Sequence, residues 1–331
     1  MSPDLPPPLR QGVESLLQGV GRSGLAARAT ALSDGYRAGK ASKVVIRSAE
    51  DATAYAAARL PATYAAIARA LWESDDRLVD FAPKSLLDAG AGPGAAGWAA
   101  TNLWAGLETA VLLDSSRIFL DLAEGLAATG PPALRDAERR LVDLTASGPW
   151  PRAELVMASY VLAEIDKDKI PSVVSNLWDA CTGLLVLVEP GSSEGWARIK
   201  LARETLGGLG AQIVAPCAHF HPCPIVAPDW CHFVQRLPRS RDHRQAKDAD
   251  RPFEDEKFIY LSVCRSDLAR HHAVGRVLAP PRTSKAGIEF KVCTPSGACA
   301  MHMVQKRNKP AYANARRLDW GDEIDLSGEA P

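Results

Sequence analysis

A strand that ends in a glycine turn and leads into a helix constrains the fold of this chain most. The segment "SLLDAGAGPGAAGWAA", residues 85–100, has an apolar run, then glycines at every second position, then a helix-forming stretch. Glycines let a backbone turn tightly and approach a ligand without a side-chain clash. The free amides at the start of the following helix would face that ligand. The segment therefore predicts a nucleotide-binding strand–turn–helix unit.

Strands and helices alternate after this turn. Further apolar candidate strands lie at 109–114, 140–144, 154–160, 183–189, 211–216 and 257–265. Short buried strands separated by helices are typical of a parallel sheet covered on both faces. We therefore expect a Rossmann-like α/β fold.

The turn and the acidic residues near it define a candidate cofactor site. Asp88 ends the first strand, and Asp114 ends the next, where it could accept both ribose hydroxyls. The D-x-G-x-G-x-G form is the methyltransferase variant, whereas dinucleotide sites use G-x-G-x-x-G. We expect S-adenosylmethionine on a methyltransferase fold, and a dinucleotide oxidoreductase is the weaker reading. Asp143 could touch the adenine amine. The candidate cofactor-binding residues are Asp88, Gly90, Gly92, Gly94, Asp114 and Asp143.

No catalytic group is visible at the end of the fourth strand. Its segment, "AELVMASYVLAEI", lacks an N-P-P-Y signature for amine methylation and has no cysteine to attack a pyrimidine. Tyr160 and Glu164 lie where a substrate would sit in this fold, and packing or capping roles are equally open for them. Because methyl transfer can run on proximity alone, an S-adenosylmethionine-dependent methyltransferase activity stays open.

Charge and hydropathy narrow the class of protein. Lysines and arginines balance acidic residues at 39 each, which argues against a globally basic nucleic-acid binder but leaves room for a local patch. No apolar run approaches the roughly 20 residues that cross a bilayer. The first residues, MSPDLPPPLR, have neither a secretory nor a transit pattern. We expect a cytoplasmic monomer with no membrane contact.

Three closely spaced cysteines predict a metal site. Cys217, Cys223 and Cys231 lie in "APCAHFHPCPIVAPDWCHF", a stretch whose prolines exclude a helix. In a reducing compartment such clusters favour metal over disulfides. A closed four-coordinate site needs a fourth ligand, and Cys264 is the best candidate because it ends a strand expected to pair with the strand before the loop. All-thiolate ligation suits zinc or a [4Fe–4S] cluster, and spacing does not separate them. The competing fourth ligands are His219, His221, His232, Cys293 and Cys299.

A basic loop after the third cysteine predicts a nucleic-acid-binding surface. Residues 235–252, "QRLPRSRDHRQAKDADRP", hold six lysines and arginines against three aspartates. RNA phosphates are the anionic partner that such clusters attract, and a solvated charged loop is the alternative. The candidate RNA-binding residues are Arg236, Arg239, Arg241, Arg244 and Lys247. A second basic cluster comprises Lys306, Arg307, Lys309, Arg316 and Arg317.

Several segments together resemble a known family. They are "YAAARLPATYAA", "LLDAGAGPGAAGWAA", "LVLVEPGSSEGW", "FEDEKFIYLSVCR" and the C-x5-C-P-x6-C-H-F run. Over about residues 10–325 the chain resembles the methyltransferase-like assembly factors of the small ribosomal subunit, known from mitochondria and with bacterial relatives. The resemblance implies a methyltransferase fold and binding to small-subunit ribosomal RNA. It also implies a four-cysteine [4Fe–4S] cluster, whose ligands here would be Cys217, Cys223, Cys231 and Cys264.

These observations predict three parts and two competing functions. We expect a helical region at 1–80, a methyltransferase-like domain at 81–270 with a cysteine-rich insertion at 215–256, and a small β module at 271–331. The leading hypothesis is a ribosomal-RNA-binding assembly or translation factor with a [4Fe–4S] cluster. The alternative is an active RNA or small-molecule methyltransferase with a structural zinc site.

Overall fold

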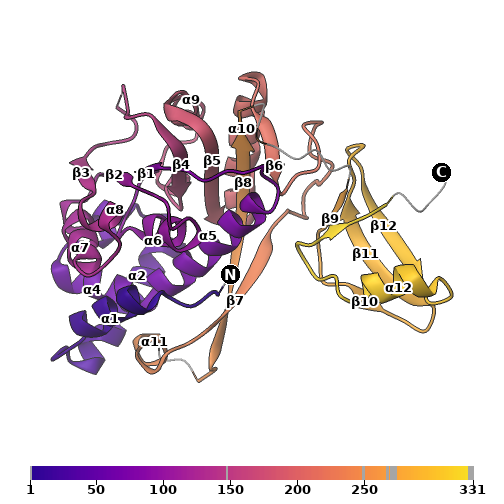
Figure 1. Cartoon of the computed structure of the whole chain (residues 1–331). Coiled ribbons are helices and arrows are strands. Elements are labelled where there is room, and N and C mark those ends of the chain that lie inside the picture. The colour runs from indigo at the N-terminus through magenta and orange to yellow at the C-terminus, as the bar shows by residue number, and fades with distance from the viewer. Residues whose placement is uncertain (1, 147, 248–249, 266–267, 269–273, 327–331) are drawn as a thin grey trace.

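The computed structural model describes residues 2–146, 148–247, 250–265, 268 and 274–326. N-terminal helices pack against one large sheet, and a smaller sheet follows towards the C-terminus (Figure 1). None of the described helices has the length and apolarity needed to span a bilayer.

The large sheet carries the predicted alternation of strands and helices. Its strands run in the order β3-β2-β1-β4-β5-β8-β6, and β7 pairs with β8 outside that path. The first five are parallel, and β8 is antiparallel to both β5 and β6. This mixed sheet confirms the expected Rossmann-like methyltransferase fold. The strands are β1 (Ser85–Ala89), β2 (Thr109–Asp114), β3 (Glu138–Leu141), β4 (Ala153–Ser159), β5 (Cys181–Pro190), β6 (Gln212–Ala215), β7 (Phe233–Pro238) and β8 (Phe253–Cys264).

Helices cover both faces of this sheet, so its central strands are buried. Residues 155–158 of β4 and 184–188 of β5 are fully buried. Burial on both faces is why these strands are unbroken apolar runs rather than alternating ones. The covering elements are α6 (Ala95–Leu103), α7 (Arg117–Ala127), α8 (Pro132–Arg135), the 3-10 turn η1 (Leu162–Glu164), α9 (Ile170–Ala180) and α10 (Ser193–Gly208).

Alanine-rich helices occupy the N-terminal region, and the last of them, α5, packs on strands of the sheet. After α1 (Pro7–Leu16), α2 (Arg22–Arg37) and α3 (Ser42–Val45), α4 (Ala49–Ala58) is followed almost at once by α5 (Leu60–Asp75). Pro61 lies in the first turn of α5, where its missing amide costs no hydrogen bond. The expectation that Pro61 kinks the stretch or starts a new helix is confirmed.

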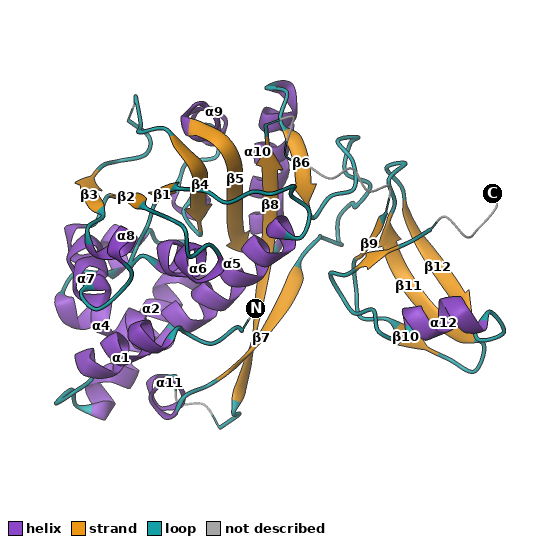
Figure 2. Ribbon diagram, viewed as in Figure 1, coloured by secondary structure: helices purple, strands orange, loops and turns teal. Residues whose placement is uncertain are grey.

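A long arm projects from the sheet. The second half of β8 pairs with β5 and β6, whereas its first half pairs with β7. Between the two strands of the arm lies α11 (Arg241–Ala246), which packs against α2 and α4. We call residues 233–258 the arm (Figure 2).

A second sheet forms what we call the C-terminal module, residues 274–326. Its strands run in the order β10-β11-β9-β13, with β12 paired to β11. The turn between β11 and β12 lies at 294–298, as the hairpin prediction around Pro295-Ser296-Gly297 requires. Phe290 and Val292 lie at the centre of a separate small core. The elements are β9 (Gly275–Val277), β10 (Arg282–Thr283), β11 (Gly287–Cys293), β12 (Cys299–Gln305), α12 (Lys309–Ala315) and β13 (Glu323–Ile324).

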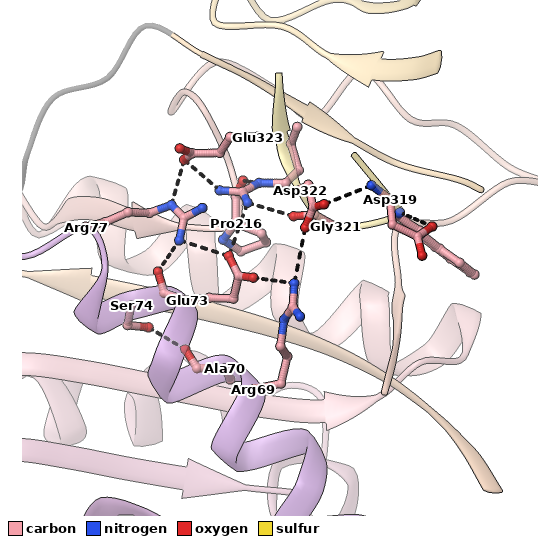
Figure 3. Close-up of polar contacts among 12 residues, drawn as sticks. Arg69, Ala70, Glu73, Ser74, Arg77, Pro216, Asp319, Gly321, Asp322 and Glu323 are labelled. Carbon is pink, nitrogen blue, oxygen red and sulfur yellow. Dashed lines mark hydrogen bonds and ion pairs between the residues drawn. The ribbon is translucent and has the colours of Figure 1, made fainter. Parts of the chain in front are cut away.

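Ion pairs join α5 to the C-terminal module (Figure 3). The Arg276 guanidinium, on β9, lies 3.3 Å from a Glu73 carboxylate oxygen on α5 and 3.1 Å from Glu323 on β13. Arg276 also donates from Nε to the Pro216 carbonyl at 3.0 Å. Arg77 closes the group through Glu323, at 2.6 Å. One side chain thus ties together α5, the C-terminal module and the start of the cysteine stretch.

Candidate functional site

The carboxyl ends of the parallel strands open onto a cavity of about 1050 Å³. Ligands of open α/β sheets bind at this edge, where the strand order reverses. The glycine turn and the end of β4 form one wall. The N-terminal helices and the arm form the other, through residues such as Tyr36, Ser42, Arg59 and Lys247.

Four of the six predicted cofactor-binding residues line this cavity. They are Gly90, Gly92, Asp114 and Asp143. Asp88 and Gly94 are not among its lining residues; Asp88 is buried under the turn. No hydrogen-bonding partner satisfies either carboxylate oxygen of Asp88 within the described part of the chain. Burial and then the neighbouring Asp114 raise the pKa of Asp88 to about 7. The Gly97 backbone amide acts in the other direction and lowers the pKa.

Asp114 holds the glycine turn in shape. Its carboxylate accepts the Gly92 amide at 2.7 Å through Oδ2 and the Ser116 amide at 2.7 Å through Oδ1. Burial raises the pKa of Asp114, and these two amides oppose that shift. Each oxygen keeps a second lone pair, so the side chain retains the capacity to accept a ribose hydroxyl.

Tyr160 and Glu164 lie at the cavity, as expected, but both are held by other side chains. The Tyr160 hydroxyl donates to Glu256 at 3.0 Å. The Ser42 hydroxyl donates to Glu164, and the Tyr36 hydroxyl lies 3.0 Å from Ser42. Tyr160 adopts a φ of 60°, a strained conformation for a tyrosine that clusters at functional sites. These contacts give both residues positioning roles and identify no proton-transfer group.

Four cysteines from two parts of the fold come into one region. Burial, followed by Cys217, Cys223 and Cys299, raises the pKa of the Cys293 thiol to about 12. Burial, followed by Cys217, Cys223 and Cys293, holds the pKa of Cys231 well above its ordinary value. Cys223 and Cys231 also pack in one small apolar cluster with Cys293.

Cys264 lies at the end of β8, between β5 and the edge strand β6 of the large sheet. Because β8 runs antiparallel to β6, Cys264 lies opposite Gln212 at the start of β6, whereas the cysteine stretch leaves from Ala215 at its end. Cys264 is fully buried, and after burial itself it raises the pKa of Cys181 on the neighbouring strand. The structure therefore brings Cys293, rather than Cys264, to the three clustered cysteines.

The other candidate fourth ligands also lie near this group. His219 Nε2 is 3.4 Å from the Cys293 sulfur, and Cys299 lies opposite Cys293 across the hairpin. None of the seven cysteines, all of which the structure describes, forms a disulfide. Among the described residues, no group of three or more histidine, cysteine or acidic side chains is arranged to hold a metal ion as it stands.

A family of known proteins matches the chain over residues of both sheets. Residues 49–325 match the family described as mitochondrial small ribosomal subunit Rsm22. The chain belongs to the Rsm22 family. The resemblance drawn from the sequence motifs is thereby confirmed, and it covers the large sheet, the cysteine stretch and the C-terminal module together.

Curated relatives of this Rsm22-family chain share about a quarter of its residues. One is the mitochondrial ribosome assembly protein METTL17 of Homo sapiens, 28% identical, in a match that covers 81% of this chain and 61% of the relative. Another is the mitochondrial Rsm22-cox11 tandem protein 2 of Schizosaccharomyces pombe, 26% identical, covering 83% and 43%. The chain thus spans less than two thirds of the length of either relative.

Solved methyltransferase structures are similar at a low level. Magnesium protoporphyrin IX methyltransferase from Synechocystis PCC 6803 with bound SAH aligns with a TM-score of 0.39 and 15% identity, over 62% of this chain and 83% of that one. The N-methyltransferase NodS from Bradyrhizobium japonicum gives 0.41 and 12%, over 62% and 97%. Likeness at this level carries no information on ligand or reaction.

The arm of this Rsm22-family chain pairs most of its predicted RNA-binding residues internally. Arg236 makes a two-pronged contact with Asp255, at 2.7 and 2.8 Å. Arg239 and Lys247 both contact Glu254. The remaining two candidates are exposed: Arg241 and Arg244. The acids that neutralise the arm are on β8, and the antiparallel pairing of β7 with β8 sets them against the arginines.

We expect Glu254→Gln to loosen the arm in a pH-dependent way. Burial raises the pKa of Glu254, but hydrogen bonds from His243 and Lys247 outweigh it and hold the pKa well below 4.5. The carboxylate therefore stabilises the fold above about pH 4.5, and this contribution is lost as the pH falls below that value. Urea unfolding at pH 7 should show a loss of about 1.5–3 kcal/mol.

The same series at pH 3.5 should bring Glu254→Gln and the wild type closer together. Asp255→Asn is the control, because its pair with Arg236 is exposed and such pairs contribute about 0–1 kcal/mol. A Glu254→Gln variant that unfolds like the wild type at pH 7 contradicts the ion-pair account of the arm.

The sequence did not predict the wall of the cavity that the N-terminal helices and the arm form. Arg59, between α4 and α5, and Ser42 on α3 contact residues more than a hundred positions later in the chain, Glu256 and Glu164. No local pattern reports such contacts. The one available signal was the run of acids in "FEDEKF", whose charges balance the basic loop that precedes them.

Proposed function

We propose that this chain is an assembly factor of the small ribosomal subunit that binds ribosomal RNA. The observation that carries the proposal is the Rsm22 match, which runs unbroken through residues 49–325. The human relative is named a ribosome assembly protein. Phosphate contacts rather than base edges would supply most of the affinity for RNA.

We extend the proposal to a [4Fe–4S] cluster held by Cys217, Cys223, Cys231 and Cys293. Four thiols suit such a cluster, and zinc is the other metal centre that they fit. Burial raises the pKa of Cys217, while the guanidinium groups of Arg203 and Arg276 oppose it. These positive charges would offset the negative charge of four thiolates. When bound, the centre would cross-link the cysteine stretch to β11 in the C-terminal module.

The cavity at the glycine turn is proposed to hold S-adenosylmethionine. Gly90 and Gly92 leave the turn open to a ligand, and Asp114 has lone pairs for ribose hydroxyls. The buried Asp88 carboxylate lacks a partner, and a cationic amino-acid end nearby would stabilise its ionised form. The proposal ends at binding, since no residue of the chain is assigned to methyl transfer.

Cysteine variants isolated without oxygen test the function and the centre together. We expect the wild type to be brown, with about four irons per chain, the content of one [4Fe–4S] cluster, and to crosslink to small-subunit ribosomal RNA in cells. Cys293→Ala should lose most of its iron because one of four ligands is gone. Cys264→Ala, which removes a sulfur from the sheet core, should retain it.

The results separately test the identity of the metal centre, its fourth ligand and the assembly-factor function. A colourless protein with one zinc would replace the cluster by zinc and keep the four ligands. If Cys264→Ala loses its iron and Cys293→Ala keeps it, Cys264 is the fourth ligand of the cluster. Absence of crosslinking between the wild type and ribosomal RNA would remove the assembly-factor proposal itself.

A further inference from the structure

One end of the C-terminal module carries lysines and arginines that form no ion pair within the described part of the chain. Between Leu278 and Leu318 the sequence has eight lysines and arginines and a single acid, Glu289. Lys291 is half-buried and paired with Asp229. The other seven are exposed, and we call them the basic end: Arg282, Lys285, Lys306, Arg307, Lys309, Arg316 and Arg317. In a chain with no net charge, this is a marked segregation.

Backbone pairing gathers these residues in one place. The Lys306 amide donates to the Ala286 carbonyl at 2.9 Å, so the loop with Lys285 lies beside the end of β12. The short α12 starts at Lys309, and Arg316 and Arg317 follow its last residue. Figure 1 shows β10 and α12 at the end of the module away from β9. After Arg317 the chain returns to the junction, where Asp322 contacts Arg69 and Glu323 contacts Arg77.

The seven side chains are available to a partner. Within the described part of the chain, no ion pair involves any of them. The arm offers the contrast, because Arg236, Arg239 and Lys247 are already bound to Asp255 or Glu254. A cation that is already neutralised must break a contact before it can bind phosphate, and a solvated one need not.

We infer that the basic end is the RNA-binding face of the chain and contacts phosphates of small-subunit ribosomal RNA. Protein interfaces are depleted in lysine and centre on apolar residues, whereas contacts to nucleic-acid backbones are made largely by lysine and arginine. The four arginines can bind phosphate oxygens through two parallel hydrogen bonds each. This inference rests on the proposed function and moves its RNA contact from the arm to the C-terminal module.

Two charge-reversal variants of equal charge change test it. One is Lys306→Glu with Arg307→Glu, at the basic end; the other is Arg241→Glu with Arg244→Glu, on the exposed surface of the arm. Full-length proteins are titrated into labelled small-subunit ribosomal RNA fragments at several salt concentrations, with polyglutamate as a competitor. The first variant should bind at least about tenfold more weakly, and its slope of log affinity against log salt should fall by about two. The second should stay within about threefold of the wild type.

The outcomes separate the inference from the proposed function. If the basic-end variant binds RNA as tightly as the wild type and the arm variant does not, the inference is overturned and the proposed function stands. A wild type that binds no RNA overturns both. If polyglutamate displaces RNA at equal charge concentration, the basic end binds acidic polypeptides as well as it binds RNA. That result also overturns the inference. Unchanged thermal melting of both variants establishes that the exposed changes leave the fold intact.

Discussion

Replacing Arg276 with glutamine should destabilise the chain by about 3–5 kcal/mol, the usual cost of removing one partner from a buried ion pair. Arg276 is only 4% exposed. It neutralises Glu73 and Glu323 and donates to the carbonyls of Gly321 and Pro216. Glutamine can replace at most one or two of these contacts and supplies no charge. The buried Glu73 carboxylate and the half-buried Glu323 carboxylate would then share one fewer cation.

Urea unfolding of Arg276→Gln measures this cost, and Arg69→Gln is its matched control. Arg69 contacts the same Glu73 at 2.6 Å, but its side chain is 31% exposed, so water can replace it. We expect the control to lose about 1 kcal/mol or less. Hydrogen exchange should also show β9 and β11 opening in Arg276→Gln while β4 and β5 stay protected. Equal losses for the two variants would show that the junction does not depend on Arg276.

Adding one methyl group to the glycine turn should destabilise the chain more at Gly90 than at Gly92. A Cβ on Gly90 would lie 2.4 Å from Val161 Cγ2, and its φ is +73°. A Cβ on Gly92 would meet nothing within 4 Å, although its φ of +53° is also left-handed. The left-handed conformation costs an alanine about 1–2 kcal/mol, and overpacking adds about 1–3 kcal/mol at Gly90. Gly90→Ala should therefore lose about 2–5 kcal/mol, and Gly92→Ala about 1–2.

Ligand binding should rank the two glycine variants in the reverse order. The open space beside Gly92 is the cavity itself, so its added methyl group occupies room for a ligand. Calorimetric titration with S-adenosylmethionine should show weakened binding in folded Gly92→Ala. A wild type that gives no heat would remove the cofactor proposal. Equal destabilisation of the two variants would instead contradict the steric account of Gly90.

The elements that local sequence predicts well are those buried on both faces. The strand expected at 109–114 is β2 itself, because a buried apolar run has sharp polar ends. The strand expected at 140–144 lies at 138–141 instead. It is the edge strand β3, and its side chains are partly or fully exposed, so hydropathy does not mark its bounds.

The candidate site was predictable where one segment supplies it and not where distant segments meet. The glycine turn and Asp114 are local, and they line the cavity together. The position of Cys264 depends on strand direction, since antiparallel pairing sets it opposite Gln212 at the start of β6, while the cysteine stretch leaves from Ala215. The arm's arginines depended on register, which places Asp255 opposite Arg236. Neither direction nor register is encoded in spacing along the chain.

The position of β8 also sets an order of events during synthesis. A ribosome making this chain releases β5 and β6 well before β8, which must insert between them. Until residue 264 has left the exit tunnel, β5 presents an unpaired edge rich in valine and leucine. Such an edge invites pairing with other chains. We therefore expect nascent chains stalled before β8 to need chaperone protection, and those released after it to need far less.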